Sequence, residues 1–512
     1  MNFKDYIMPF TFALVSTLAL QYYFLTDKNV RHGENSFIAP QERKEYKPLS
    51  TEIDFFDVQE PEQTVVTEIE TQWAILHFST YGASLESLDV KREFDGKTTA
   101  IRTVFPAAQE EREKRCFLVG LPDKTPFYYS LVLHDENEDS HRLVYFANND
   151  ECSIRKTFTV NKNSSKIDLL LDVMPQSGMN ITITPRVLYP APLMPDMRSE
   201  DVISSIVIDQ SDVFAKKRAD QLEAGRGWFK PELFGSDSRY FIHALIADSN
   251  DFVQRAYYKL EDKDRLTSII EGPSVQAQSS WQLSFYCGAK DLTSINMVDS
   301  RLEKTLDYSG WFSYIAKLML YLLKWFYKYL HNYGLAIIAL TLLFKILLFP
   351  LALRNDEKKM REKQAEYQHR LAIIKNRFKD NPEKLAVEQA ELLKTHGMPS
   401  LGCLIPLLLQ LPIFFSLSRV LASSFELYKA PMLWISDLSS RDPYYILPFI
   451  VMLVMLMPDG KMDPQQRTTK IAMAFAFGAL TSTFSAGLTL YIATDRILGV
   501  VQSKLMKYFK LV

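Results

Sequence analysis

Five apolar segments follow one another in the C-terminal third of the chain and constrain its fold more than any other feature. They run over Asn332–Leu351, Leu401–Phe425, Tyr444–Met457, Thr468–Phe484 and Gly487–Lys504. An α-helix rises about 1.5 Å per residue, so about 20 apolar residues cross the roughly 30 Å core of a bilayer. We therefore predict five membrane-spanning helices. Tyr444–Met457 and Thr468–Phe484 are short, and we expect a thinned bilayer or shielding by protein around them.

A sixth apolar segment, Tyr6–Leu25, lies at the beginning of the sequence. A cleaved signal peptide is one interpretation. The apolar stretch is long for that, however, and no clear A-x-A site follows it. We predict an uncleaved signal anchor over residues 1–26, followed by a polar, proline-containing linker over residues 27–63.

Residues 64–306 show a different periodicity, in which apolar residues alternate with polar ones. Ile167, Leu169, Leu171 and Val173 share one strand face, Ile181 and Ile183 share another, and Trp281, Leu283 and Phe285 share a third. Many short alternating strands indicate an antiparallel β-sandwich. We predict a long loop around Pro185, Pro190, Pro192 and Pro195.

Composition excludes several classes of function. The formal net charge is −2, which gives no whole-chain case for specific nucleic acid binding. The four cysteines, Cys116, Cys152, Cys287 and Cys403, form no CxxC pair and no zinc spacing. No phosphate-binding loop, HExxH or GxSxG motif is present. We therefore predict no metal, no cofactor and no enzymatic chemistry.

The segment over residues 307–330 is rich in apolar and aromatic residues but carries Lys317, Lys324 and Lys328 along one helical stripe. A narrow cationic stripe on an apolar helix is typical of an interfacial helix. The alternative is a further spanning helix. The orientation of the chain favours the interfacial interpretation.

That orientation follows from a charged stretch, predicted as a helical hairpin over residues 354–396. It contains 11 lysines and arginines, among them Arg361, Lys375, Arg377 and Lys384, and the positive-inside rule assigns it to the cytoplasm. One crossing at Asn332–Leu351 then connects it to an external β domain. If residues 307–330 also crossed the membrane, the basic hairpin would lie on the outer side, against the positive-inside rule. Both termini, including the tail at residues 508–512, are predicted to be cytoplasmic.

Charged residues interrupt three of the apolar segments. Lys345 lies within an otherwise apolar stretch, Arg419 lies in the second segment, and Asp495-Arg496 lies in the last. Such charges are costly unless they pair or line a water-filled cavity. An Arg419–Asp495 pair offsets part of that cost. The alternative is a polar groove that all four charges line, and the partner of Asp495 among Arg419, Arg496 and Lys345 stays open.

Further polar residues and prolines within the predicted five-helix core, residues 331–507, are candidates for this groove. Gln410, Ser416, Ser418 and Thr494 are candidates for its wall. Pro406 and Pro412 each free an upstream carbonyl, so we expect a bent helix there. Asp442-Pro443 has the pattern of a helix cap and first-turn proline. Trp434, Tyr444 and Tyr445 are expected at the outer interface.

Strings within this block resemble those of the YidC/Oxa/Alb family of membrane protein insertases. The matching strings, in order, are Phe349-Pro350-Leu351, Pro406 to Phe414, Ala430-Pro431, Leu433-Trp434-Ile435, Asp437-Leu438, Asp442 to Pro448, Gly487-Leu488 and Leu490-Tyr491. The resemblance covers residues 307–507 strongly. The anchor and β domain match the Gram-negative members by architecture. Asp237 to Phe241 is a further string that resembles the family.

The resemblance implies six transmembrane helices, a periplasmic β-sandwich domain of the super-sandwich type and a place in the bacterial inner membrane. It implies an insertase and chaperone that acts from the cytoplasmic side through a hydrophilic groove. The implied partners are nascent membrane proteins, the Sec translocon, the ribosome, a targeting receptor and the bilayer. In the family, an arginine usually occupies the position of Lys345, and Asp495-Arg496 replaces an uncharged polar pair. A transporter or channel with an extracytoplasmic sensing domain is the rival interpretation.

Overall fold

The structure is a computed structural model in which the chain divides into two compact units, a β unit ending at Leu306 and a helical unit beginning at Asp307. It describes residues 53–55, 64–94, 97–107, 111–121, 124–176, 182–195, 197, 201–222, 226–262, 265–306, 313–354, 366, 369–379, 381–396, 401–457 and 464–508. The predicted anchor, most of the linker and Arg361 lie outside the described residues, as do the side chains of Pro406 and Gln410.

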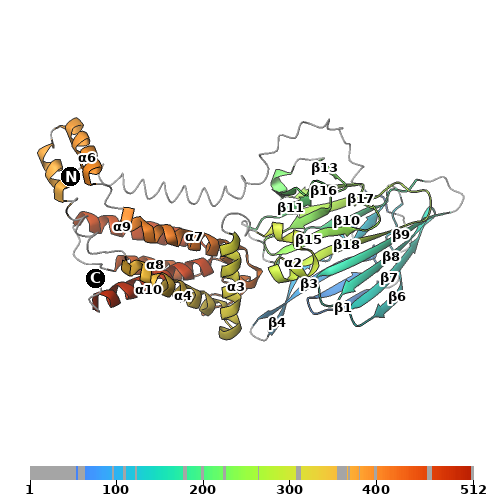
Figure 1. Cartoon of the computed structure of the whole chain (residues 1–512). Coiled ribbons are helices and arrows are strands. Elements are labelled where there is room, and N and C mark those ends of the chain that lie inside the picture. Colours follow the sequence, from blue (N-terminus) through green and yellow to red (C-terminus); the bar gives the residue numbers. More distant parts are fainter. Residues whose placement is uncertain are drawn as a thin grey trace. The chain divides into compact units, whose positions relative to one another are not determined.

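The β unit contains three antiparallel sheets (Figure 1). The largest has the order β12 (Phe214–Arg218), β11 (Ser204–Ile208), β14 (Leu233–Asp237), β15 (Phe241–Asp248), β18 (Ser279–Ala289), β9 (Lys166–Pro175), β8 (Cys152–Asn161), β7 (Ser140–Asn148) and β6 (Ser130–Glu136). The second has the order β13 (Gly227–Phe229), β16 (Arg255–Asp262), β17 (Arg265–Glu271), β10 (Arg186–Pro190) and β5 (Leu118–Gly120). The third has the order β1 (Val66–Glu70), β2 (Ala74–Ser79), β3 (Ser84–Phe94) and β4 (Lys97–Val104). The predicted β-sandwich is confirmed.

Two of the predicted strand faces meet in the core of this unit. Ile167, Leu169 and Leu171 of β9 pair with Phe285, Leu283 and Trp281 of β18, and all six side chains are buried. Because side chains alternate across a strand, this register directs both apolar rows to the same face of the sheet. The predicted loop around Pro185–Pro195 is wrong in part, because β10 lies between two of its prolines. Ile181 lies outside the described residues.

Buried polar side chains connect the sheets. Lys156 of β8 is fully buried, and its ammonium donates to the carbonyls of Gly82, Ala83 and Phe117 at 2.6, 3.1 and 2.7 Å. All three acceptors lie in turns with left-handed backbone, at φ of 66°, 41° and 65°. Burial lowers the pKa of Lys156 well below its usual range. One side chain therefore ties two strained turns to the largest sheet.

A second buried group, His243 of β15, faces the end of β10. Its Nδ1 lies 3.0 Å from the carbonyl oxygen of Pro190, so Nδ1 carries the proton. Burial lowers the pKa of His243 from 6.5 to about 4. The ring is therefore neutral in the folded protein at neutral pH.

The helical unit contains α3 (Ser313–Leu330), α4 (Tyr333–Arg354), α6 (Pro382–His396), α7 (Leu401–Ser423), α8 (Ile446–Leu456), α9 (Pro464–Thr481) and α10 (Ala486–Tyr508). α10 packs against α4, α7 and α8. α3 packs against α4 and α7, and α8 packs against α9. Within the described residues, no helix combines the length and the unbroken apolar character that a membrane span requires.

Local capping explains where two of these helices begin. Asn381 accepts from the backbone N–H of Lys384 at 3.2 Å, as the predicted cap before Pro382 requires. The predicted helix start at Asp442-Pro443 is wrong, because α8 begins at Ile446 after Tyr445 takes a left-handed φ of 55°. The Asp442 carboxylate nevertheless accepts from Leu447 N at 2.7 Å and so still caps the first turn.

We expect Lys156→Met to destabilise the β unit by about 3–5 kcal/mol, because it leaves three buried carbonyls without donors. Pulse proteolysis of the full-length protein over a urea series measures this. Lys162→Met is the matched control, since it removes only the partly exposed 2.7 Å pair with Glu136 and should cost less than about 1 kcal/mol. Equal losses for the two variants contradict the role of Lys156.

Acid should destabilise the β unit through His243. The folded-state pKa of about 4 lies below the unfolded value of 6.5, so the unfolded state binds more protons between these pH values. Stability therefore falls as pH decreases through this window, by about 3 kcal/mol in total. His243→Asn keeps a donor toward Pro190 but cannot titrate. Pulse proteolysis at pH 7 and pH 4.5 should show a smaller loss for the variant, and parallel losses contradict the assignment.

Candidate functional site

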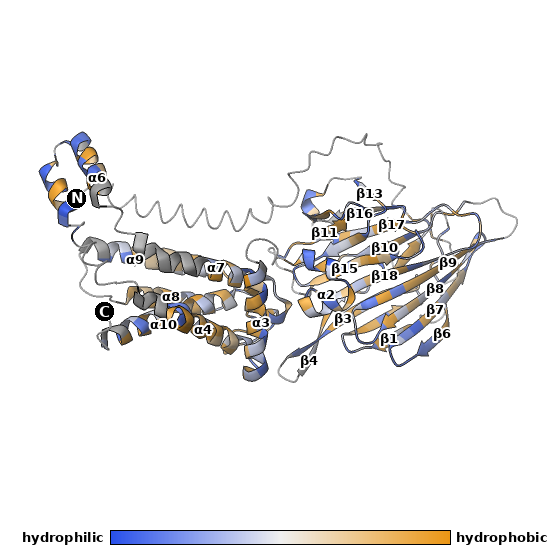
Figure 2. Ribbon diagram, viewed as in Figure 1, coloured by the Kyte–Doolittle hydropathy of each residue, from blue (hydrophilic) through white to orange (hydrophobic). Residues whose placement is uncertain are grey.

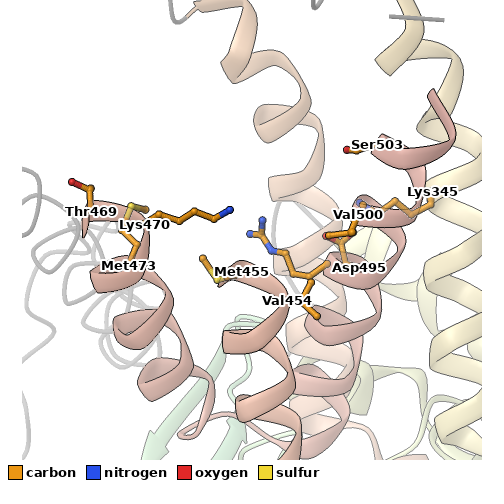
Figure 3. Close-up of a pocket in the computed structure, with 11 residues that line it drawn as sticks. Lys345, Val454, Met455, Thr469, Lys470, Met473, Asp495, Val500 and Ser503 are labelled. Carbon is orange, nitrogen blue, oxygen red and sulfur yellow. The ribbon is translucent and has the colours of Figure 1, made fainter. Parts of the chain in front are cut away.

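Lys345 and Asp495 form an ion pair between α4 and α10. The Lys345 Nζ lies 2.8 Å from Asp495 Oδ1, and the two side chains are 25% and 19% exposed. Figure 3 shows the two side chains meeting between their helices. α4 is otherwise apolar around this position, so the carboxylate replaces part of the hydration that the ammonium loses.

The pair lies at the wall of a cavity of about 710 Å³. Its described lining comes from α4, α8, α9 and α10: Lys345, Val454, Met455, Thr469, Lys470, Met473, Asp495, Arg496, Gly499, Val500 and Ser503. The lining thus has apolar side chains beside three cations and one carboxylate. A cavity of this composition attracts anions and also offers apolar contact.

The two other cations of the lining are held by neighbouring groups. The ammonium of Lys470 donates to the carbonyl oxygen of Met457, at the C-terminal end of α8. The guanidinium of Arg496 lies 5.7 Å from the centre of the Phe477 ring on α9. These contacts hold the α8–α9 pair and α10 around the cavity.

Gly499 lies beside the ammonium of Lys345. A Cβ at this glycine would be in van der Waals contact with Lys345 Nζ, at 3.9 Å. Asp495, Gly499 and Ser503 are spaced four residues apart on α10, so they share one helix face. This face carries in succession the Asp495 carboxylate, a glycine without a side chain and the Ser503 hydroxyl.

The predicted groove residues divide into two groups. Lys345, Asp495 and Arg496 line the cavity together, whereas Ser416, Arg419 and Thr494 are not among its described lining residues. Ser416 is fully buried in α7, and its hydroxyl has no hydrogen-bond partner within the described part of the chain. The carbonyl of Arg419 accepts from Ser423 Oγ at 2.7 Å. Among the partners left open for Asp495, the structure contains the pair with Lys345.

Sequence reasoning missed several lining residues. The spacing of four on α10 could have identified Gly499 and Ser503, because they share the face of Asp495. Met455, Met473 and Lys470 carried no such signal, since their position depends on how α8 and α9 pack. Within the described residues, no group of histidine, cysteine, aspartate or glutamate side chains could hold a metal ion.

A second ion pair joins α3 to the segment after α7. Lys324 Nζ lies 2.6 Å from Glu426 Oε1, and the Glu426 side chain is buried. α3 also carries large exposed side chains, at Tyr314, Leu318, Tyr321, Trp325 and Tyr329, on the side away from its buried residues Ala316, Met319, Leu320 and Leu323. One lysine of the predicted cationic stripe is therefore used for internal packing.

The segment between α7 and α8 is held by two carboxylates. Asp437 Oδ1 accepts from the N–H groups of Lys429 and Ser439, each at 2.9 Å. Asp442 Oδ1 accepts from the indole of Trp434 at 3.1 Å. Exposed Leu433, Tyr444 and Tyr445 project from this segment. Its shape is thus set by internal hydrogen bonds.

Comparison with known proteins matches both units of the chain. The family model described as 60Kd inner membrane protein matches residues 325–511, and the YidC periplasmic domain model matches residues 67–322. The membrane protein insertase YidC of Geotalea uraniireducens is 30% identical over 85% of this chain and 85% of its own length. The membrane protein insertase YidC of Geobacter metallireducens is 26% identical over 91% of this chain and 89% of its own length.

A solved structure described as an active YidC insertase with the first transmembrane domain resolved is 17% identical. It covers 88% of this chain and 94% of its own, with a TM-score of 0.37. The two family models together span nearly all of the chain after residue 67, and the relatives match it over most of their length. The chain therefore belongs to the YidC family of membrane protein insertases.

Proposed function

We propose that this protein inserts membrane proteins from the cytoplasmic side, and that the cavity at Lys345 receives the polar flank of the incoming segment. The observation that supports this proposal is a cation held beside apolar side chains in an open cavity. A carboxylate or polar group that enters such a cavity meets charges and water in place of hydrocarbon. The apolar part of the segment then partitions into lipid, which supplies the driving force without covalent chemistry or nucleotide hydrolysis.

The helical unit would span the membrane with α4, α7, α8, α9 and α10, and residues 6–25 would add a sixth helix. Figure 2 shows that α4 is largely apolar. Large apolar side chains face outward from four helices, including Ile346, Leu347, Phe449, Leu453, Ile471, Phe475, Ile497 and Val501. Exposed apolar surface of this extent favours a lipid environment.

α3 would lie along the outer interface. Its exposed row of tyrosines and Trp325 has the amphipathic character of residues at the level of lipid head groups. α8 has 11 residues, which gives roughly 17 Å of helix and about half of a bilayer core. A thinned bilayer beside α8 and α9 would shorten the path of a substrate's polar flank.

The hairpin would be the first cytoplasmic contact of a nascent segment. Lys375, Arg377 and Lys384 are exposed there, so they can reach acidic groups of a nascent chain or a ribosome. Membership of the family supports the Sec translocon, the ribosome and a targeting receptor as further partners. The bends at Pro406 and Pro412, and a role for Gln410, Ser416, Arg419 and Thr494, stay part of the proposal.

We expect Lys345→Glu to lower insertion of single-span substrates with acidic flanks by about tenfold or more, because two carboxylates would then face each other in the cavity. Lys345→Arg keeps the cation and should retain most activity. The assay depletes the native protein and complements it with each variant, with protease protection of the substrate flank as the measurement.

Lys429→Glu is the matched control, because it reverses an exposed lysine of the same unit outside the described cavity lining. It should insert substrates normally. Undisturbed insertion after depletion contradicts the proposed function. Full activity of Lys345→Glu contradicts only the role of the cavity charge.

The proposed topology predicts opposite labelling of two single cysteines. Asn163→Cys in the β unit should react with a membrane-impermeant maleimide in cells whose outer membrane is permeabilised, whereas Ala390→Cys in α6 should react only after the inner membrane is opened. Both positions are exposed, and Cys116, Cys152 and Cys287 are buried. Cys403→Ser provides the background. Labelling of Ala390→Cys in cells with an intact inner membrane contradicts an interfacial α3, because an additional crossing would then be required.

A further inference from the structure

We propose that Asp495 is an internal competitor of the substrate: it occupies Lys345 between insertion events, and an incoming carboxylate must displace it. Asp495 then determines which substrates can use the cavity. This inference rests on the proposed function of the cavity and deepens it by assigning the requirement for acidic groups to one residue of α10.

The geometry of the Lys345–Asp495 pair leaves room for a second carboxylate. At 2.8 Å, Asp495 makes a charge-assisted hydrogen bond with Lys345, of the kind an acidic substrate residue would make. An ammonium has three N–H donors, and the Lys345 side chain lines the cavity and is 25% exposed. A second carboxylate can therefore reach the ammonium that Asp495 already contacts.

Charge repulsion opposes the binding of both carboxylates at once. Two carboxylates at one ammonium repel each other, so a substrate carboxylate binds there most favourably when Asp495 moves away. The exchange replaces one ion pair by another of the same chemistry, and it breaks the contact between Asp495 and Lys345. A single acidic residue on a substrate flank therefore gains little from the exchange.

Flanks with several acidic residues can use the other cations of the cavity. Arg496 and Lys470 line the same cavity, so the lining residues that the structure describes include three cations and one carboxylate. Additional acidic residues of a flank can contact these cations and offset the loss of the Lys345–Asp495 pair. Asp495 thus sets a threshold, so that strongly acidic flanks enter and weakly acidic flanks do not.

A purely structural role of Asp495 makes a different prediction. If the carboxylate only neutralises Lys345 so that the lysine can be buried, then its removal destabilises the helical unit. Insertion of every substrate would then fall in parallel. The two roles are therefore distinguished by the dependence of insertion on flank charge, and not by the activity toward any one substrate.

The experiment compares Asp495→Asn with the native residue in full-length protein. Three substrates share one apolar segment and carry zero, one or three aspartates in the flank. We expect Asp495→Asn to raise the insertion of the one-aspartate flank relative to the three-aspartate flank by about fivefold to tenfold. The zero-aspartate flank should not change. Photo-crosslinking from position Met455, which lines the cavity, should rise for the same one-aspartate substrate.

Glu426→Gln is the matched control, because it removes a buried carboxylate from another lysine pair of the same unit, outside the described cavity lining. It should leave the ratio between the flanks unchanged. Asp495→Glu keeps a competing carboxylate and should keep the native threshold. Protease resistance of each variant in the membrane reports whether it folds.

Two results would overturn the inference. One is an unchanged ratio between the one- and three-aspartate flanks in a folded Asp495→Asn protein, and the other is the same change of ratio in Glu426→Gln. Both leave the proposed function intact if the native protein still inserts the three-aspartate substrate. Failure of the native protein to insert or crosslink that substrate contradicts the proposed function itself.

Discussion

A cation within an apolar helix must have a partner that replaces its water, and this requirement governs the helical unit. Lys345 finds that partner in Asp495 because α4 packs against α10 at this level. The pair is only partly exposed, yet one side of the ammonium still faces the cavity. The arrangement stabilises a charge without enclosing it. A lysine that was fully enclosed could not exchange partners, and an exposed one would interact weakly with any anion.

The β unit also buries polar side chains, but there the hydrogen-bond partners enclose the buried group. Two of its buried polar side chains bind fixed backbone acceptors: Lys156 has three carbonyls, and His243 has the carbonyl of Pro190. Asp237, in the string that resembles the family, accepts from Lys216 and Lys290 at 2.7 and 2.5 Å. These contacts join strands and turns within the unit. They favour a rigid domain, whereas the cavity of the helical unit keeps a charge accessible.

Features that depend on neighbours in the sequence could be predicted well. The alternation in β9 and β18 identified buried faces because the period of a strand is two residues. The cap at Asn381 followed from the same local reasoning. Two local predictions were wrong for physical reasons. Proline is tolerated at the ends of a strand, so the prolines around Arg186–Pro190 did not prevent β10. The left-handed Tyr445 delayed α8 beyond the proline that was expected to begin it.

The sequence by itself determined the order of apolar segments, the alternating β domain, the family and the presence of Lys345, Arg419, Asp495 and Arg496 in apolar surroundings. Only the tertiary structure decided that Lys345 holds Asp495 and that Met455, Lys470 and Met473 complete the cavity. Counting residues along a helix gives the depth of a charge but not the direction in which its side chain points. That direction is fixed when α4, α8, α9 and α10 pack, because packing sets the rotation of each helix about its own axis.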